Sequence, residues 1–584
     1  MLVAILVASP TVFAPWMLDD YLHQDALAIQ LGEAAGPAIQ GAVSDRYGLP
    51  SLFCFVPGGA AERAAMEASG VLPWWSDPEL AVCFWRPLSS FIALAEHALW
   101  GGRAALSHLH TLLWVGLLAG LSAALLQRLR LGWLGVGAAL LYVIDDAHVI
   151  PVLWAASRNA LWAATFAAGA AHLGLSRLRG AGGGAALGLF ACSAAMLLAG
   201  EAGVGGLAVL LSLALFYGRG GVWGRLQALW PAALSAALWL GAYAGSGAAV
   251  RGTVWYRDPR EDLGHWLREA AAAAPVLASN GFGLLSGDAL LVAPELRGAL
   301  IVQGCTLLLA VAVLTGRAWA GLSADERRAT AMGALGYALS LAPSLSTVPQ
   351  NRLILVGGLG ANLLVAVILR FCLRSLVELG PMRPLERARG WLAWPILLVH
   401  VLWATASWPL FSLGVRASEG VARRAQAAGL PAAEGGGALF VGVSDPALVV
   451  YMRAAARLAG QEPKGAWHLV SASGGAHRVE RLSAGALRVE ALGPAMAARP
   501  FERLYRGAPV PAGMESRRGA LLFRVEAADA ATGGARIVRI EAEGSLDDLG
   551  YQLVRWDGKG YVSAPLPAVG EALEWPWRPG PAGY

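Results

Sequence analysis

Long apolar segments occupy most of the chain up to about residue 413. Many of them have the roughly 20 residues that a helix needs to cross a membrane. The 584 residues are 56% hydrophobic and only 15% charged, whereas soluble domains average about 45–50% and about 25%. With a net charge of +5, this composition excludes a disordered protein, a small disulfide-framework protein and a nucleic-acid-binding domain.

These segments predict an all-α, polytopic membrane bundle over residues 1–413, with about eleven transmembrane helices. An odd number of helices places the two ends of the chain on opposite sides of the membrane. The predicted spans are 1–17, 107–127, 131–150, 159–176, 184–200, 202–218, 227–246, 298–316, 329–346, 353–371 and 391–413.

The distribution of arginine sets the predicted orientation, because short cytoplasmic loops collect Arg and Lys. Every second loop of the bundle is rich in arginine, with fourteen arginines against four acids in the loops 128–130, 177–183, 219–226, 317–328 and 370–390. The first alternate loop, 18–105, instead has ten acids and four arginines. We therefore expect an integral protein of the plasma (inner) membrane with a cytoplasmic N-terminus and an extracytoplasmic, periplasmic tail.

The first predicted span is short, and no basic residue precedes it. A signal peptide carries a charged start and a small-residue cleavage site. We therefore expect an uncleaved first helix, with a cleaved signal peptide as the alternative. Whether the N-terminus is complete stays open.

Two outer loops are long, 18–105 and 247–297. Their tryptophans fit rings at the membrane–water interface; these are Trp74, Trp75, Trp85, Trp100, Trp255 and Trp266. Cys54 and Cys83 share the first of these loops, where an oxidising compartment could pair them. The spacing leaves that pairing open.

Residues 414–584 form a different kind of sequence, with short segments of alternating apolar and polar residues. They predict a small, soluble β-rich (α+β) domain with a helix near 446–460. The predicted strands are 439–443, 486–492, 520–526, 536–542 and 551–556. Asp557-Gly558 is typical of a tight hairpin turn.

Ionisable residues at the predicted membrane edge are the candidates for a site, because charge near a bilayer is costly. They lie on the side opposite the Arg-rich loops, which favours one shared site; they are Asp19, Asp20, Asp145, Asp146, His148, Arg158, Glu201 and Arg352. Asp19 and Asp20 directly follow the first span. Such a pair could bind a divalent cation, act as a general base, or be a solvated helix end.

The order of these motifs resembles the GT-C superfamily of polyprenyl-phosphate-sugar glycosyltransferases, which includes protein O-mannosyltransferases and an aminoarabinose transferase. Family members carry an acidic motif after the first helix, matched by Asp19-Asp20-Tyr21. A Trp/Tyr-Arg-Pro-Leu element and a His-rich start of the next span resemble Trp85–Leu88 and Ser107–Leu113. A His-Pro-x-His, Val-x-Trp, Arg-Asp element is similar to Asp145–Asn159, without its first His and Pro. Glu201 matches a Lys-Glu element that lacks its Lys here, and Arg352 resembles a late outer arginine.

The resemblance implies an inverting transferase that moves a sugar from a polyprenyl-phosphate donor to an acceptor on the outer face. The acceptor would be a glycan, a lipid or a protein, and membrane lipids would surround the bundle. Asp19 or Asp20 would act as catalytic base, and Arg86, Arg158 and Arg352 would bind the donor phosphate. Asp145, Asp146, His148 and Glu201 would lie around them or hold a divalent cation such as Mg or Mn.

Other functions stay open from the sequence: a non-catalytic membrane scaffold of the same kind, a polysaccharide polymerase or ligase, or a transporter. A transporter is expected to show inverted repeats with broken helices at matching positions, and we find no such symmetry. A polymerase or ligase is expected to have its large outer loop late in the membrane part, whereas here the longest loop comes first.

Overall fold

The computed structural model describes residues 1–34, 39, 43–377, 384–427, 437–443, 446–461 and 465–578. Residues 378–383 of the predicted inner loop 370–390 lie outside this description. The chain divides into two compact units, each built from segments that are far apart in sequence. The first unit comprises residues 1–15, 85–246 and 258–413, and the second comprises 16–84, 247–257 and 414–584.

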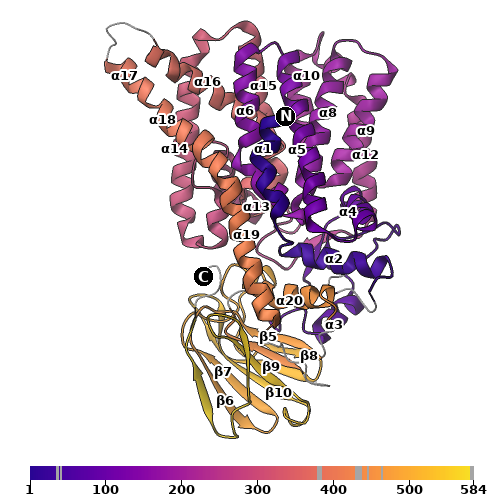
Figure 1. Cartoon of the computed structure of the whole chain (residues 1–584), viewed down its shortest axis with the longest axis vertical. Coiled ribbons are helices and arrows are strands. Elements are labelled where there is room, and N and C mark those ends of the chain that lie inside the picture. The colour runs from indigo at the N-terminus through magenta and orange to yellow at the C-terminus, as the bar shows by residue number, and fades with distance from the viewer. Residues whose placement is uncertain are drawn as a thin grey trace. The chain divides into compact units, whose positions relative to one another are not determined.

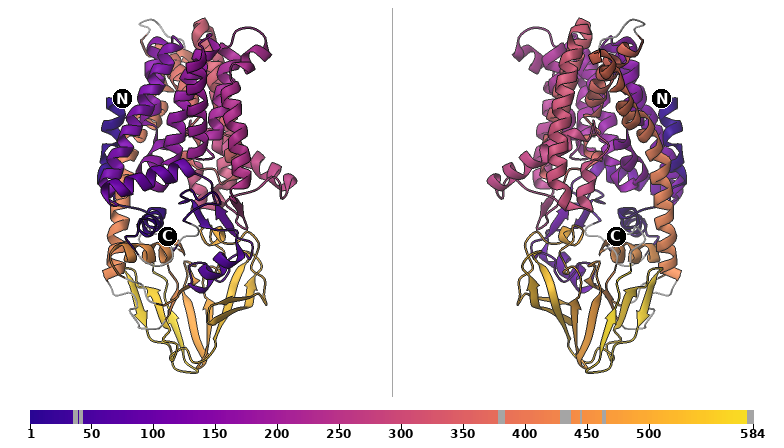
Figure 2. Two further views of the ribbon diagram at one scale, coloured as in Figure 1. Left: turned by 90° about the vertical axis from the view of Figure 1, so that its right-hand side faces the viewer. Right: turned by 90° about the vertical axis from the view of Figure 1, so that its left-hand side faces the viewer.

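The first unit is helical, and its longer helices run side by side up and down the unit (Figures 1 and 2). Its main helices are α1 (Leu2–Ala8), α4 (Pro87–Trp100), α5 (Ala104–Arg128), α6 (Gly132–Ile144), α8 (Asn159–Leu178), α9 (Gly183–Ala199), α10 (Gly203–Tyr217), α12 (Trp230–Gly245), α13 (Leu263–Ser279), α14 (Arg297–Ala318), α15 (Ala324–Ser340), α16 (Gly358–Val377), α17 (Pro384–Trp391), α18 (Ala393–Leu397) and α19 (Ala404–Ala427, in this unit up to Leu413).

Short helical segments join these helices. They are η1 (Ser9–Phe13), η2 (Asp146–His148), α7 (Val149–Leu153), η3 (Ala155–Ser157), α11 (Val222–Gln227), η4 (Gly287–Leu291), η5 (Pro294–Leu296), η6 (Trp319–Gly321), η7 (Ala342–Ser346), η8 (Asn351–Ile354) and the π-helical turn η9 (Leu398–Trp403).

Among the residues that the structure describes, three helical stretches are long and apolar enough to cross a membrane, by length and composition: Ala104–Arg128, Pro294–Gly321 and Ala388–Ala417. Gly132–Ile144 and Asp146–Leu153 would make a fourth, bent by 42°. The predicted number of eleven spans is therefore not confirmed. One physical reason is interruption: the predicted span 131–150 breaks after Ile144, and the predicted span 1–17 contains only seven α-helical residues before a 3₁₀ turn with Pro10.

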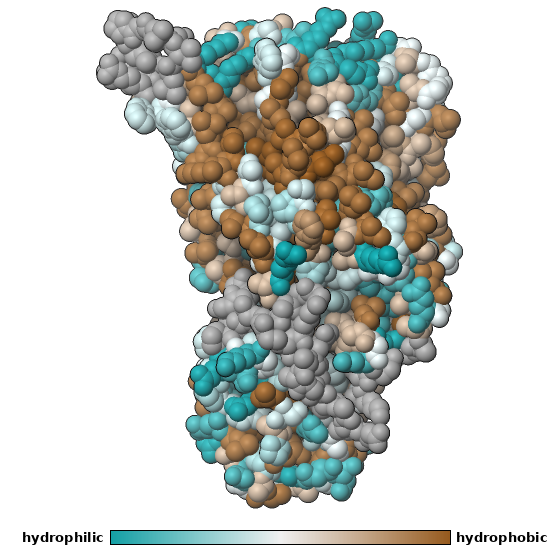
Figure 3. Space-filling model, viewed as in Figure 1, coloured by the Kyte–Doolittle hydropathy of each residue, from teal (hydrophilic) through white to brown (hydrophobic). Residues whose placement is uncertain are grey.

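The surface of the helical unit is apolar, as a lipid-facing surface would be. Leu113, Trp133, Leu187, Leu309 and Leu402 are each more than 60% exposed. Figure 3 shows hydrophobic side chains over much of the visible face of this unit and hydrophilic side chains at one of its ends. A soluble protein rarely exposes so large an apolar area.

The described part of the second unit contains three sheets. A three-stranded sheet has the order β1 (Cys54–Val56), β2 (Ala81–Cys83), β3 (Ala249–Arg251). An antiparallel sheet has the order β13 (Ala572–Trp575), β6 (His477–Ser483), β7 (Ala486–Ala491), β10 (Gly534–Ala542), β9 (Leu521–Asp529), β8 (Glu515–Arg518). The third has the order β12 (Tyr561–Ala564), β11 (Gln552–Trp556), β4 (Ala438–Val441), β5 (Trp467–Ser471). Its helices are α2 (Asp19–Gln30), α3 (Ala60–Ala68) and α20 (Pro446–Leu458), with a 3₁₀ turn η10 (Glu502–Leu504).

The predicted β-rich tail is confirmed, including the strands β7, β10 and β11 and the helix α20 within about two residues of their expected ends. The Asp557 side chain accepts hydrogen bonds from the backbone N–H groups of Lys559 (2.7 Å) and Gly560 (2.8 Å). Gly558 has a φ of 98°, which favours glycine. This turn joins β11 to β12, as the Asp557-Gly558 pattern predicts.

The interface-anchor prediction is wrong for Trp74 and Trp75, because both indoles lie in the core of the second unit. They are 1% and 0% exposed, and Trp74 stacks on Phe523 with ring centroids 6.0 Å apart. The Trp74 indole N–H donates to the Val470 carbonyl (2.9 Å), and that of Trp75 donates to the Glu502 carbonyl (3.0 Å). The first outer loop thus supplies part of the core of the tail.

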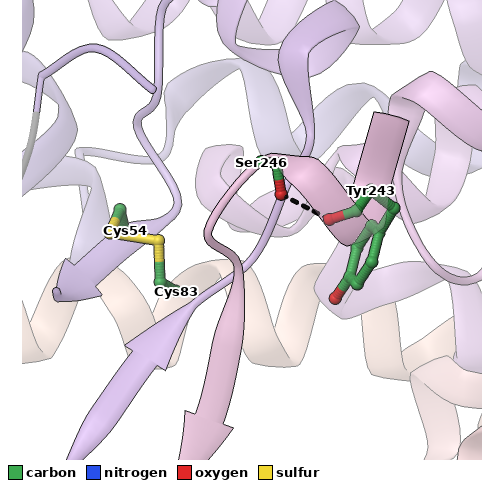
Figure 4. The surroundings of a disulfide bond; sticks show 4 residues. All are labelled: Cys54, Cys83, Tyr243 and Ser246. Atoms are coloured by element: carbon green, nitrogen blue, oxygen red, sulfur yellow. Dashed lines mark hydrogen bonds between the residues drawn. A yellow bond between two sulfur atoms is a disulfide. The ribbon is translucent and has the colours of Figure 1, made fainter. Parts of the chain in front are cut away.

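Cys54 and Cys83 form a disulfide, which resolves the pairing that the sequence leaves open. They face one another on the neighbouring antiparallel strands β1 and β2 (Figure 4). The bond closes the segment that contains α3, Trp74 and Trp75. Disulfides persist in oxidising compartments, and the side of the membrane on which this loop lies stays a prediction.

Candidate functional site

The chain between α6 and α8 presents Asp145 and Asp146 at the end of the helical unit where α6 ends and α8 begins. Asp145 caps the short turn η2, because its Oδ1 accepts the backbone N–H of Ala147 at 2.9 Å. Its Oδ2 accepts a hydrogen bond from the Asn362 amide of α16 at 2.7 Å. Asp145 is therefore a buried carboxylate that ties two helices together.

Asp146 is bound by residues from two distant parts of the first unit. Its Oδ2 accepts the indole N–H of Trp403 at 3.2 Å, and the Asn351 side chain also hydrogen-bonds to it. Trp403 ends the π-helical turn η9 within the last apolar helix. Single π-turns often occur at functional sites. The neighbouring His148 is buried and packs edge-on against Tyr142, with ring centroids 4.6 Å apart.

Arg352 lies at the start of the same network. Its Nε donates to Gln350 Oε1 at 2.7 Å, and its Nη1 donates to Ser157 Oγ at 3.0 Å across 195 residues of sequence. Its guanidinium lies 5.1 Å from the ring centroid of Trp154. An indole face attracts a cation such as this guanidinium. Two motifs that the sequence analysis singles out, 145–159 and Arg352, are thus brought together.

Asp288 supports this turn. Its Oδ2 accepts hydrogen bonds from the Asn351 backbone N–H (3.1 Å) and from the Ser286 hydroxyl (3.0 Å). Burial raises the pKa of the Asp288 carboxyl, although both hydrogen bonds and the charge of Arg352 act in the opposite direction. The carboxyl therefore sits in a poorly solvated place next to the Asn351-Arg352 turn.

Arg158 lies in a different environment, in a buried ion pair with Glu96 of α4. Its Nη1 and Nη2 donate to Glu96 Oε1 (2.9 Å) and Oε2 (2.7 Å), a bidentate geometry. The Ser107 carbonyl and the Thr111 hydroxyl accept further bonds from Nη1, each at 3.2 Å. The guanidinium that the sequence analysis assigns to a donor phosphate is thus engaged by a carboxylate of the chain itself.

His110 also binds Glu96, and the tautomer of its ring follows from its hydrogen-bond partners. The Trp114 indole, which can only donate, bonds to His110 Nε2 at 2.9 Å, so Nε2 accepts. Nδ1 therefore carries the hydrogen and donates to Glu96 Oε1 at 2.5 Å. Burial raises the pKa of Glu96, but Arg158 and His110 outweigh it, so the net shift is downward. Glu96 stays ionised between Arg158 and a neutral imidazole.

Arg86 also has an acidic partner, because its Nε donates to Glu201 Oε2 at 2.7 Å. Gly200, which precedes Glu201, packs closely against Asn159: a Cβ at this position would lie 2.8 Å from the side-chain amide nitrogen of Asn159. Two predicted site residues, Arg86 and Glu201, are therefore together, joining the starts of α4 and α10.

Asp19 and Asp20 belong to the second unit and begin α2. Asp20 is 1% exposed, and its Oδ2 accepts the Met17 backbone N–H at 3.1 Å. Asp19 Oδ1 accepts a hydrogen bond from the Tyr451 hydroxyl at 2.6 Å. The preceding Leu18 has φ 47°, an unusual backbone conformation for a bulky residue, costing roughly 1–3 kcal/mol.

No group of three or more His, Cys, Asp and Glu side chains within the described parts of the chain is arranged to hold a metal ion. Asp146 and His148 are neighbours in sequence, but the His148 ring packs on Tyr142. The divalent cation of the sequence analysis therefore stays a prediction.

The sequence analysis does not single out Glu96, Asp288 or Trp403. Glu96 carries a usable signal, because it is an acid in the otherwise apolar helix α4. Asp288 follows a half-apolar stretch and carries a weaker signal of the same kind. Trp403 has none, because the π-turn that directs it toward Asp146 has no sequence signature.

No protein-family model and no curated protein matches the chain. Similar solved structures include the oligosaccharyltransferase AglB of Archaeoglobus fulgidus in complex with an inhibitory peptide and a dolichol-phosphate, with 11% identity and a TM-score of 0.39. The match covers 78% of this chain and 62% of AglB, so the chain spans less than two thirds of its length. ArnT of Cupriavidus metallidurans bound to undecaprenyl phosphate has 15% identity and a TM-score of 0.32, with 67% of this chain and 78% of ArnT covered. Both structures contain a polyprenyl phosphate, dolichol-phosphate in AglB and undecaprenyl phosphate in ArnT.

Proposed function

We propose that the protein is an integral membrane glycosyltransferase that moves a sugar from a polyprenyl phosphate to an acceptor hydroxyl. The observation that carries the proposal is the placement of Arg352. Its guanidinium lies over Trp154 and is held by the hydroxyl of Ser157 and the side-chain oxygen of Gln350. An arginine that is stacked on an indole and bound by a hydroxyl and a side-chain amide, in a unit with an apolar surface, suits the phosphate of a lipid donor.

In the proposed reaction the acceptor oxygen forms a bond to the anomeric carbon as the bond from that carbon to the phosphate oxygen breaks. The proton of the acceptor hydroxyl passes to Asp19 or Asp20, and the electron pair of the broken bond stays on the polyprenyl phosphate. Attack opposite the leaving phosphate inverts the anomeric centre. General-base help of this kind contributes roughly 10²–10⁴-fold, and Arg352 stabilises the charge on the leaving phosphate.

The three arginines of the sequence hypothesis then receive different roles. Arg352 is the proposed phosphate ligand. Arg158 and Arg86 each already have a carboxylate partner, Glu96 and Glu201, and we assign them to holding the helix ends around the site. Asp146 and Asn351 hold the turn that carries Arg352, while Asp145 binds Asn362 and His148 packs on Tyr142.

A non-catalytic membrane scaffold is the second candidate, and a specific observation favours it. Both acids of the proposed base motif have partners inside the chain: Asp20 accepts the Met17 N–H, and Asp19 accepts the Tyr451 hydroxyl. Carboxylates used only to hold helix α2 in place would have such partners too.

The test of the proposed function is mass spectrometry of lipid-linked sugars and envelope glycans from cells with and without the gene. We expect one polyprenyl-phosphate sugar to accumulate when the gene is deleted and one glycan modification to disappear. An Arg352→Gln gene should fail to restore the modification, whereas Arg327→Gln, at the start of α15 among the Arg-rich turns, should restore it. Unchanged lipid-linked sugars and glycans on deletion would favour the scaffold.

A further inference from the structure

We infer that Tyr451 is a positioning residue for Asp19, so that helix α20 of the tail takes part in orienting the base. The inference rests on the proposed function, in which Asp19 or Asp20 accepts the proton. It assigns a role to the C-terminal part of the chain, which carries no recognisable catalytic motif of its own.

A hydrogen bond and an ion pair connect α2 and α20, both within the second unit. The Tyr451 hydroxyl donates to Asp19 Oδ1 at 2.6 Å. The Nε of Arg457 lies 3.2 Å from Asp25 Oδ1. Asp19 and Asp25 are six residues apart on α2, and Tyr451 and Arg457 are six residues apart on α20, which is about 9 Å along either helix. The two contacts therefore match in spacing and order, and they fix one axial register between the helices.

Apolar packing supplies the rest of this helix pair. Leu22 of α2 and Ala454 of α20 are buried in one cluster, with Tyr451 and Tyr21 packed against it. This packing holds the helices together but does not select the direction of a carboxylate. The hydroxyl of Tyr451 acts on that direction, because a charge-assisted hydrogen bond to one carboxylate oxygen restrains the rotation of the group.

The two contacts differ in what they are suited to do. Asp25 and Arg457 form an ion pair with side chains only 1% and 9% exposed, and Asp25 Oδ2 also accepts the Ile39 N–H at 3.3 Å. This contact serves the packing of the unit. The Tyr451 contact instead acts on an acid of the proposed base motif, as a third group orients the base of a catalytic pair. Small misplacement of a reacting group is costly in rate.

The experiment compares two variants of the full-length protein in lipid nanodiscs, with undecaprenyl-phosphate sugars as donors. Tyr451→Phe removes only the hydroxyl. The matched control, Asp25→Asn with Arg457→Gln, removes the other contact without leaving one charge buried. Steady-state kcat, donor KM and the thermal unfolding midpoint are measured for each.

We expect Tyr451→Phe to lower kcat about ten- to hundredfold, the range of a lost hydrogen bond to a charged group, with donor KM and the unfolding midpoint close to wild type. The control should lower the midpoint and leave kcat within about twofold. Wild-type kcat in Tyr451→Phe, or a fall in kcat that follows the midpoint equally in both variants, would overturn the inference alone. Absence of transfer by the wild-type protein from every such donor would instead overturn the proposed function and the inference with it.

Discussion

Two arginines of the helical unit, Arg158 and Arg352, show how differently one residue type is used near one end of a bundle. Arg158 is 3% exposed, and both of its terminal nitrogens donate to the Glu96 carboxylate. Arg352 has hydroxyl, amide and indole neighbours. A buried arginine with a bidentate acid is largely neutralised. The charge of Arg352 also acts on the Asp288 carboxyl, but its guanidinium donates to a hydroxyl and an amide oxygen, which leaves it more attraction for an anion. The comparison separates an arginine that supports the fold from one suited to a ligand.

The largest expected effect comes from removing the acid that partners Arg158. Glu96→Gln leaves a buried guanidinium without its counter-charge, and such a change costs about 3–5 kcal/mol of unfolding free energy. The measurement is thermal or denaturant unfolding of the purified protein in detergent. Glu96→Gln combined with Arg158→Met should recover most of the loss, because no buried charge then remains. Equal stability of Glu96→Gln and wild type would contradict a structural role for the pair.

Buried histidines of the second unit contrast with the Glu96–Arg158 ion pair, because burial favours their neutral form. Burial lowers the pKa of His468 and of His477 to about 4, against 6.5 when exposed. The folded state thus favours the neutral ring, so its full contribution is present above pH 6.5 and is lost as the pH falls toward 4. Each buried histidine lowers the free energy of unfolding by up to about 3 kcal/mol at low pH.

The measurement for the histidines is hydrogen exchange of amides in β5 and β6 between pH 7 and pH 4, corrected for the intrinsic exchange rate. Protection should fall toward the acid end, and less steeply in His477→Gln. Amides near the Glu96–Arg158 pair in the first unit should keep their protection over the same pH range, because the pKa of Glu96 is lowered. Protection that stays constant down to pH 4 in the second unit would exclude neutral burial of these rings.

Arg352→Gln should weaken donor binding more than it changes stability. The loss of one charge-assisted hydrogen bond corresponds to about 1.5–3 kcal/mol, or roughly ten- to hundredfold in donor KM or Kd. Binding of undecaprenyl phosphate, followed by tryptophan fluorescence with Trp154 nearby, is the direct measurement. The double variant Arg158→Gln with Glu96→Gln removes the buried ion pair. If it reduced donor affinity as much as Arg352→Gln, the different roles proposed for the two arginines would be wrong.

The smallest expected effect is at the edge of the Glu96 network. Trp114→Phe removes the indole N–H that donates to His110 Nε2 and keeps most of the ring packing. We expect a loss of about 1 kcal/mol of unfolding free energy. The readout is the unfolding midpoint, with Trp133→Phe as a control, because Trp133 is 89% exposed.

Much of the architecture follows from residue patterns. The apolar segments indicate helices, and strict alternation together with Asp557-Gly558 indicates the strands and hairpin of the tail. The division into units is less accessible from the sequence. Residues 16–84 form part of the second unit because Trp74 and Trp75 pack into the tail core, and no local pattern distinguishes a tryptophan in such a core from one at a membrane interface.

The site could be predicted in part. Asp146 and Arg352 lie in one network through Asn351, as the common side of their motifs suggests. The partners of Arg86 and Arg158 could not be predicted, because Glu201 and Glu96 lie far from them in sequence and pairing depends on how the helices pack. The same holds for the π-turn at Trp403 and for the bond between Tyr451 and Asp19, which joins residues 432 positions apart.

The position of Trp74 and Trp75 in the tail core has a consequence for the order of synthesis. Val470, which accepts the indole N–H of Trp74, is made 396 residues later, which is roughly 20 to 80 s at the usual rates of translation. Cys54 and Cys83 need only each other and adjacent strands, so their disulfide can close while the tail is still unmade. Until the tail is made, the core that buries these two indoles is incomplete.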